Sequence, residues 1–135
     1  MDNRKLLNDD ELEQIVGGTG TGAGMANWAQ RAYNEGWSYV WGGASPGSVD
    51  ASGLISSYAG TAHNAEAMFA AAPVKGPIAT MPDIPGIGVY MLGHVGVYVG
   101  NGMTICALNE SDGIAYKPCS AMPWTQWFQI PGVSY

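Results

Sequence analysis

The order of its expected elements predicts that this chain folds as an α+β domain, with N-terminal helices packed on an antiparallel sheet. Apolar residues recur at helical spacing in the first part of the chain, whereas runs rich in β-branched and aromatic residues fill the later part. The dipeptide Asn101-Gly102 lies between two of these runs, and it is a strong signal for a two-residue hairpin turn. Helices followed by antiparallel strands are typical of the α+β class.

Three helices are predicted. They span residues 25–35, 51–59 and 64–71. In the first helix, Trp28, Ala29 and Ala32 share the face that we expect to turn inward. The second helix follows Asp50, a favourable N-cap residue. Residues 37–43 form a short aromatic run, residues 44–48 a Pro/Gly loop, and residues 73–85 a Pro-rich connection without regular structure.

Five strands are predicted in the later part of the chain. They span residues 87–91, 95–99, 103–108, 114–117 and 127–130. A hairpin turn at residues 109–113 places Cys106 opposite a residue near Tyr116 rather than opposite Cys119. We therefore expect two free thiols instead of a disulfide.

Composition excludes several classes of function. The net charge is −6 and there are only five Lys and Arg residues, which argues against a nucleic-acid partner. No apolar run approaches the length of a membrane span, and no Sec-type signal peptide is present. No spacing of His and Cys indicates a metal site, and no cofactor is expected.

The first 18 residues differ from the rest, because they carry seven of the sixteen charged residues. Residues 11–18 read Glu-Leu-Glu-Gln-Ile-Val-Gly-Gly, a pattern that resembles the double-glycine leader of bacteriocin-like secreted peptides. The resemblance implies that Leu7, Leu12 and Ile15 bind a leader-processing ABC transporter peptidase, which cleaves after Gly17-Gly18. It also implies secretion by a Gram-positive bacterium.

The expected organisation is thus a leader at 1–18, a flexible Gly/Thr linker at 19–24 and a domain at 25–135. The alternative is that the first segment is an N-terminal helix that packs on its own domain and ends in Gly-Gly.

Three further stretches carry a second resemblance. Residues 39–43 read Tyr-Val-Trp-Gly-Gly, residues 49–55 read Val-Asp-Ala-Ser-Gly-Leu-Ile, and residues 93–100 read Gly-His-Val-Gly-Val-Tyr-Val-Gly. Together they resemble the NlpC-type cysteine peptidases of bacterial cell-wall hydrolases. The resemblance covers residues 25–135 and implies a papain-like fold that cleaves peptidoglycan stem peptides or other short peptides containing D-amino acids.

The resemblance implies a catalytic set with two departures from the family pattern. Ala51 occupies the position of the nucleophilic Cys, His94 that of the base, and Cys106 that of the third residue, which orients the base. A cysteine peptidase needs a thiolate, a base and an orienting group, and Ala cannot attack a carbonyl. A neutral thiol is also a weak hydrogen-bond partner for imidazole. As written, the chain is expected not to catalyse the family reaction.

The resemblance also implies that Tyr39 lies near the oxyanion site, and that Asp50 and Ser52 receive the free amine of the stem peptide. Tyr39, Asp50 and His94 each have a structural alternative: Tyr39 as a core aromatic, Asp50 as a helix cap and His94 as an exposed strand-end residue. His63 lacks such a context, and we expect it to be a surface residue.

Two explanations of Ala51 remain open, namely an engineered Cys→Ala replacement and a natural pseudoenzyme that binds wall peptides or a partner protein. A single engineered change explains Ala51 but not Cys106, whereas natural decay explains both. A third hypothesis, from another class, is a bacteriocin-like secreted cargo whose activity is binding or inhibition.

Overall fold

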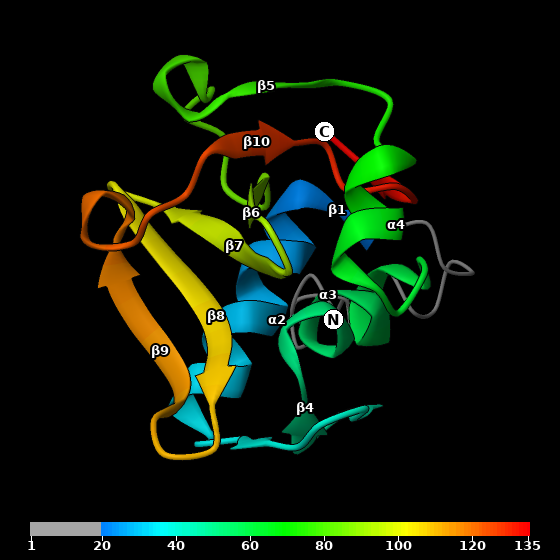
Figure 1. The fold of residues 1–135 in the computed structure, drawn as a ribbon, viewed down its shortest axis with the longest axis vertical. Coiled ribbons are helices and arrows are strands. Elements are labelled where there is room, and N and C mark those ends of the chain that lie inside the picture. Colours follow the sequence, from blue (N-terminus) through cyan, green and yellow to red (C-terminus); the bar gives the residue numbers. More distant parts are fainter. Residues whose placement is uncertain (1–19) are drawn as a thin grey trace, which may run out of the picture.

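The computed structural model describes residues 20–135, in which helices pack against a six-stranded antiparallel sheet (Figure 1). The sheet has the order β5-β10-β6-β7-β8-β9. Its strands are β5 (Lys75–Pro77), β6 (Gly88–Met91), β7 (His94–Gly100), β8 (Met103–Asn109), β9 (Gly113–Pro118) and β10 (Gln126–Phe128). The α+β fold class is confirmed. The predicted leader, with its residues Leu7, Leu12, Ile15, Gly17 and Gly18, lies outside the described residues.

The five strands predicted from sequence are all present, and their ends agree to within about two residues. The hairpin turn between β7 and β8 is confirmed, because Asn101 and Gly102 have φ angles of 55° and 75°, which the favoured two-residue turn requires. The pairing of β8 with β9 places Cys106 opposite Ala115, and both Cys106 and Cys119 are free thiols, as expected. Strand β5 lies inside the connection that was expected to have no regular structure.

Three helices follow one another along the chain: α2 (Gly22–Asn34), α3 (Ala51–Ala59) and α4 (Ala65–Ala70). Trp28, Ala29 and Ala32 of α2 are buried, as their spacing predicts. Two 3-10 turns, Ile78–Thr80 and Cys119–Ala121, complete the helical content of the described part. Within residues 20–135, no helix combines the length and apolar character that crossing a membrane requires.

Residues 20–24 are not a flexible linker, contrary to the sequence prediction. Gly20 and Thr21 form β1, which pairs in parallel with β11 (Val133–Ser134). Helix α2 begins at Gly22 because the Thr21 hydroxyl accepts a hydrogen bond from the Gly24 amide at 3.1 Å. The Gly-rich composition predicted a flexible segment, but the strand pairing and the helix cap hold it in place.

The sheet buries a core on each of its two faces. Leu54 and Ile55 of α3 pack with Val95 and Val97 of β7 in the cluster that also includes α2. The intervening residues of β7 point to the opposite face, because side chains alternate along a strand. There Tyr98 packs with Val89, Cys106 and Trp124 in a second, smaller cluster. Strand β7 therefore lies between two cores, and its first residue is His94.

A second, three-stranded sheet leads the chain into α3. It consists of β2 (Ser38–Tyr39), β3 (Ala44–Ser45) and β4 (Ser48–Val49), in the order β2-β4-β3. The start of α3 lies so close to this sheet that a Cβ atom on Gly53 would come within 1.8 Å of the Gly43 carbonyl oxygen. Only glycine fits there. The close approach brings Tyr39 and the first residue of α3 to the same region.

Candidate functional site

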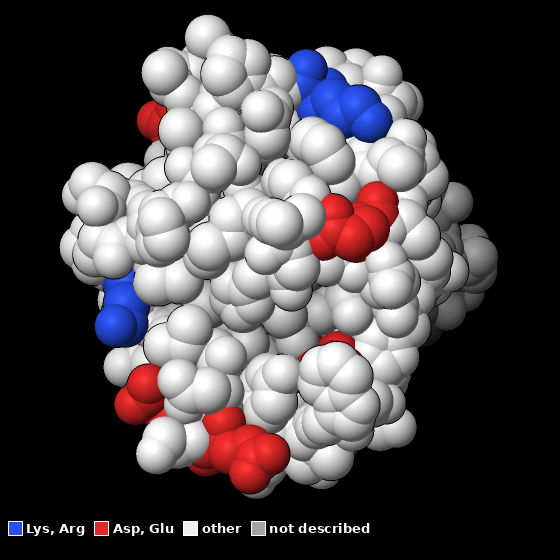
Figure 2. Space-filling view, viewed as in Figure 1, with Lys and Arg blue, Asp and Glu red and all other residues white. Residues whose placement is uncertain are grey.

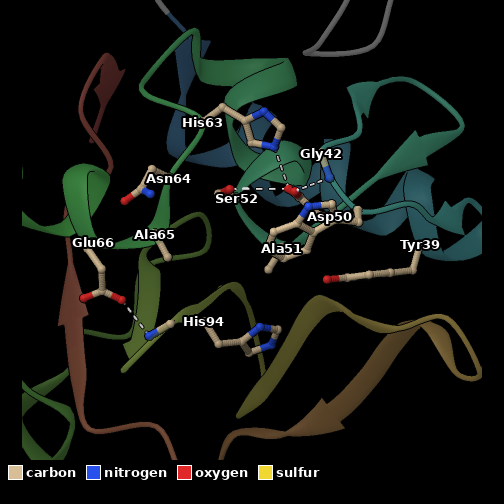
Figure 3. A pocket seen from close by; sticks show the side chains of 12 residues that line it. Tyr39, Gly42, Asp50, Ala51, Ser52, His63, Asn64, Ala65, Glu66 and His94 are labelled. Atoms are coloured by element: carbon tan, nitrogen blue, oxygen red, sulfur yellow. Dashed lines mark hydrogen bonds and ion pairs between the residues drawn. The ribbon is translucent and has the colours of Figure 1, made fainter.

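A pocket of about 350 Å³ opens at the N-terminus of α3 (Figure 3). We call it the α3 pocket. Among its lining residues are Tyr39, Asp50, Ala51, Ser52, His63 and His94. Five of the six residues that the sequence indicated for a peptidase-like site are thus brought together, from β2, α3 with its cap, and β7. The sixth, Cys106, does not line the pocket.

Ala51 is the first residue of α3, and its side chain faces the α3 pocket (Figure 3). Asp50 is the N-cap, and its Oδ1 accepts a hydrogen bond from the Gly53 amide at 2.7 Å. Unpaired backbone N–H groups and the helix dipole make this position favourable for a negative charge. A thiolate would be stabilised here, but the methyl group of Ala51 offers no nucleophile.

The Asp50 carboxylate is held by donors from three sides, as Figure 3 shows. Besides the Gly53 amide, Oδ2 accepts from the Gly42 amide at 3.0 Å, and the Ser52 hydroxyl donates to Oδ1 at 3.3 Å. His63 Nε2 also lies 2.7 Å from Oδ1. Asp50 is therefore the helix cap and also lines the pocket.

His63 was expected to be a surface residue without a role. Its side chain is indeed partly exposed, yet it pairs with Asp50 at the mouth of the α3 pocket. The residue comes from the loop between α3 and α4, and only the tertiary fold brings this loop over the cap. No local pattern in the sequence signals this contact.

His94 has an environment suited to a neutral base. Burial lowers the pKa of its imidazole below the usual value, so the ring is uncharged at neutral pH. The ring stacks on Trp124, with centroids 5.5 Å apart and an interplanar angle of 5°. The His94 Nε2 atom is buried and has no hydrogen-bond partner among the described residues.

Cys106 does not supply the missing partner. Cys106 is buried in the second, smaller core cluster together with Trp124, and burial raises the pKa of its thiol to about 12. The thiol is therefore protonated at any physiological pH and is neither a nucleophile nor an anionic orienting group. Stacking on Trp124 fixes the plane of the His94 ring instead. No such role was predicted for Trp124, because aromatic residues in this part of the chain are more often part of a core.

Glu66 of α4 is a further pocket residue that sequence reasoning missed. Its Oε1 accepts a hydrogen bond from the Gly93 amide at 2.6 Å, and its Oε2 accepts one from the Tyr90 hydroxyl. These bonds tie α4 to the turn immediately before His94 (Figure 3). The position of His94 thus depends on α4, which lies almost thirty residues earlier in the chain.

The arrangement offers a base, a helix N-terminus and a hydroxyl group around one small space. Tyr39 directs its hydroxyl toward the middle of the pocket (Figure 3). Within residues 20–135, no three His, Cys, Asp or Glu residues are grouped to hold a metal ion.

Comparison with known proteins identifies the fold. No protein-family model matches the sequence, and no curated protein matches it. Solved structures do match. A protein described as NlpC2 from Trichomonas vaginalis superposes with a TM-score of 0.68 over 81% of this chain, at 22% identity. The NlpC/p60 domain of the peptidoglycan hydrolase SagA gives a TM-score of 0.63 over 82%, at 20% identity.

The chain has the fold of NlpC/p60 domains. The peptidoglycan hydrolase RipB from Mycobacterium tuberculosis also matches, with a TM-score of 0.58 over 81% of this chain at 21% identity. The match covers 99% of the SagA domain but only 46% of the Trichomonas protein and 66% of RipB. The papain-like NlpC/p60 fold, expected from three short motifs, is therefore confirmed.

Proposed function

We propose that this chain is a peptidase-like binding protein of the NlpC/p60 fold, which holds short peptidoglycan stem peptides in the α3 pocket without cleaving them. One observation carries the proposal. Ala51 lies at the helix N-terminus, in one pocket with His94 and Tyr39, so the surroundings of a nucleophile are present but the nucleophile is not. The peptidoglycan hydrolases among proteins of the same fold support the choice of ligand.

The geometry suits a peptide that carries a free amine. Asp50, with Ser52 beside it, offers a carboxylate for that amine. A peptide carbonyl placed over Ala51 would meet the backbone N–H groups of α3 and the Tyr39 hydroxyl, which are suitable donors for an oxyanion. With a thiol at position 51, neutral His94 would take its proton, sulfur would attack the carbonyl, and the leaving amine would receive the proton before water releases the acyl group.

Binding without turnover tests the proposal. Calorimetric titration with a stem tetrapeptide should show saturable binding, and mass spectrometry of the same mixture should show only intact peptide. Asp50→Asn is the informative variant, because Asn caps a helix as well as Asp does but carries no charge. It should weaken binding by about tenfold. The amide NH2 would face the Gly42 amide that now donates to Oδ2, so the melting temperature should fall somewhat, and the titration is run well below it. Absence of binding at millimolar peptide, or release of a product, would contradict the proposal.

We further propose that the chain is secreted by a Gram-positive bacterium through a double-glycine leader. The pattern at residues 11–18 supports this proposal. A cognate leader-processing transporter peptidase should release a fragment that begins at Thr19, directly before β1. Gly18→Val should block the cut, because a side chain would not fit a cleft shaped for glycine. A cut at another position would rule the leader out.

The bacteriocin-like hypothesis predicts a different readout. If the leader exports a cargo that binds or inhibits another protein, the secreted fragment should act on target cells and show no affinity for stem peptides. The codon for residue 51 in the native gene separates an engineered replacement from a natural pseudoenzyme.

A further inference from the structure

A second hollow lies directly beside the α3 pocket. It measures about 550 Å³ and is lined by Tyr39, Trp41, Asn109, Glu110 and Ser111. We call it the Trp41 hollow. Tyr39 and Trp41 line both spaces, so a ligand in the α3 pocket can extend over the two aromatic rings toward the β8–β9 turn.

Two side chains of the Trp41 hollow have no structural use within the described residues. Trp41 is 84% exposed, and its indole makes neither a ring contact nor a hydrogen bond there. In residues 20–135, the Glu110 carboxylate likewise has neither a hydrogen bond nor an ion pair. The exposed indole contributes nothing to the core, and because it borders the α3 pocket it is available to a ligand that extends from there.

The turn that presents Glu110 is well defined. The Asn109 side chain donates to Asp112 Oδ2 at 3.0 Å, and its Oδ1 accepts from the Asp112 amide at 2.7 Å. These bonds close the turn between β8 and β9 around Glu110. The carboxylate is therefore presented by a fixed backbone, which lowers the entropic cost of using it in binding.

The charges around both spaces have one sign. Among residues 20–135, no Lys or Arg lines the α3 pocket, the Trp41 hollow, or the adjoining hollow beneath the β8–β9 turn, which includes Asp112. Figure 2 shows acidic side chains gathered at the end of this face where that turn lies, with the Lys and Arg side chains at its margins. A ligand carboxylate would find no cation here and would be repelled by Glu110, whereas an ammonium group would be attracted.

We propose that Trp41 and Glu110 form a subsite for a side-chain ammonium group, so that the ligand is a short peptide with a lysine-type side chain. The indole face attracts the cation, and the carboxylate pairs with it. A diamino acid with an additional side-chain carboxylate, such as diaminopimelate, fits less well because that carboxylate has no partner. This assignment rests on the proposed peptide binding in the α3 pocket and specifies its ligand.

The test uses three stem tripeptides that differ only at the third residue: lysine, Nε-acetyl-lysine and meso-diaminopimelate. Calorimetric titration of the full chain at low salt should show the lysine peptide binding about tenfold more tightly than the other two. Raising the salt to 0.5 M should reduce this preference, because exposed charges are screened.

The variants Glu110→Gln and Trp41→Leu should each reduce affinity for the lysine peptide by between about twofold and fivefold. Glu110 does not line the α3 pocket, so Glu110→Gln should leave affinity for the acetylated peptide unchanged. Glu35→Gln is the matched control. It removes one negative charge from a residue that lines neither space but bonds to Arg31 and Trp37, and it should not alter the preference. All altered side chains are exposed, so melting curves should stay close to that of the parent chain.

The outcomes separate the two proposals. If all three peptides bind equally and Glu110→Gln has no effect, the ammonium subsite is wrong while peptide binding stands. Tighter binding of the diaminopimelate peptide would likewise overturn the subsite. If none of the three peptides binds the parent chain, the proposed function itself fails, and the subsite fails with it.

Discussion

Replacing Ala51 with Cys should create a reactive thiol, and the size of the effect follows from the position. Residue 51 begins α3, where a thiolate is stabilised by the helix N-terminus. His94 contributes no positive charge at neutral pH, because burial lowers the pKa of its imidazole, and the Asp50 carboxylate next to the site opposes ionisation. The helix terminus alone should therefore lower the thiol pKa from about 8.5 to about 7.

This shift changes the thiolate fraction at pH 7 from about 3% to about 50%. The intrinsic nucleophilicity of a thiolate falls as its pKa falls, by about fivefold for this shift. The net gain in alkylation rate at pH 7 is therefore only about threefold. The midpoint of the pH–rate profile is a better measure than a single rate, because it reports the pKa without the nucleophilicity.

The assay is alkylation by iodoacetamide between pH 5 and 10, followed by mass spectrometry of the digested protein, which separates the adduct at the variant site from one at Cys119. Ala59→Cys provides the control, since residue 59 is the last of the same helix, where the dipole raises a thiol pKa. We expect a midpoint near 7 for Ala51→Cys and one at or above about 8.5 for Ala59→Cys. Cys106 should not react in the folded protein because it is buried. Equal midpoints for the two variants would refute the assignment of residue 51 to an activating position.

Three other predictions concern the scaffold. Gly53→Ala should lower the free energy of unfolding by about 3 kcal/mol, because its Cβ would lie 1.8 Å from the Gly43 oxygen; Ser56→Ala on the same helix should have little effect in the same urea titration. Leu54→Ala, in the core, should cost about 2–5 kcal/mol by the same measurement. Because the pKa of His94 is lowered in the folded state, the unfolded state binds more protons below about pH 6.5. The contribution of His94 to the free energy of unfolding is therefore complete above that pH. It declines as the pH falls toward the folded-state pKa, by at most about 1.4 kcal/mol per pH unit. His94→Gln should flatten this decline; an unchanged slope would show that the burial of His94 does not govern it.

Local signals predicted the parts of the fold that depend on local interactions. Helix α3 has the predicted bounds, Ala51–Ala59, because its cap, its apolar face and the glycine that ends it are all encoded within a few residues. The β7–β8 hairpin was predicted for the same reason, since Asn101 and Gly102 tolerate the left-handed backbone that the turn requires.

Contacts between distant segments could not be predicted in this way. His63 and Glu66 reach the pocket because the loop after α3 returns to the cap residue Asp50 and α4 then begins beside the pocket. Neither residue type is unusual in a surface loop or a short helix. Trp124 stacks on His94 across the sheet, where Gly96 leaves room for the indole ring. Such contacts come from packing, which sequence periodicity does not report.

The parallel pairing of β1 with β11 has a consequence for how the chain is made. Gly20 and Thr21 leave the ribosome early, but their partners Val133 and Ser134 are synthesised after every other element of the sheet. Throughout synthesis, the backbone that precedes α2 is therefore an unpaired strand, while β6, β7 and β8 can already pair with neighbours close in sequence. The hydroxyl of Tyr135, which donates to the Gly86 carbonyl at 2.7 Å, completes this closure last. Gly20 and Thr21 thus gain their strand partner only when residues 133 and 134 have been made, so the start of α2 is held to the rest of the fold late.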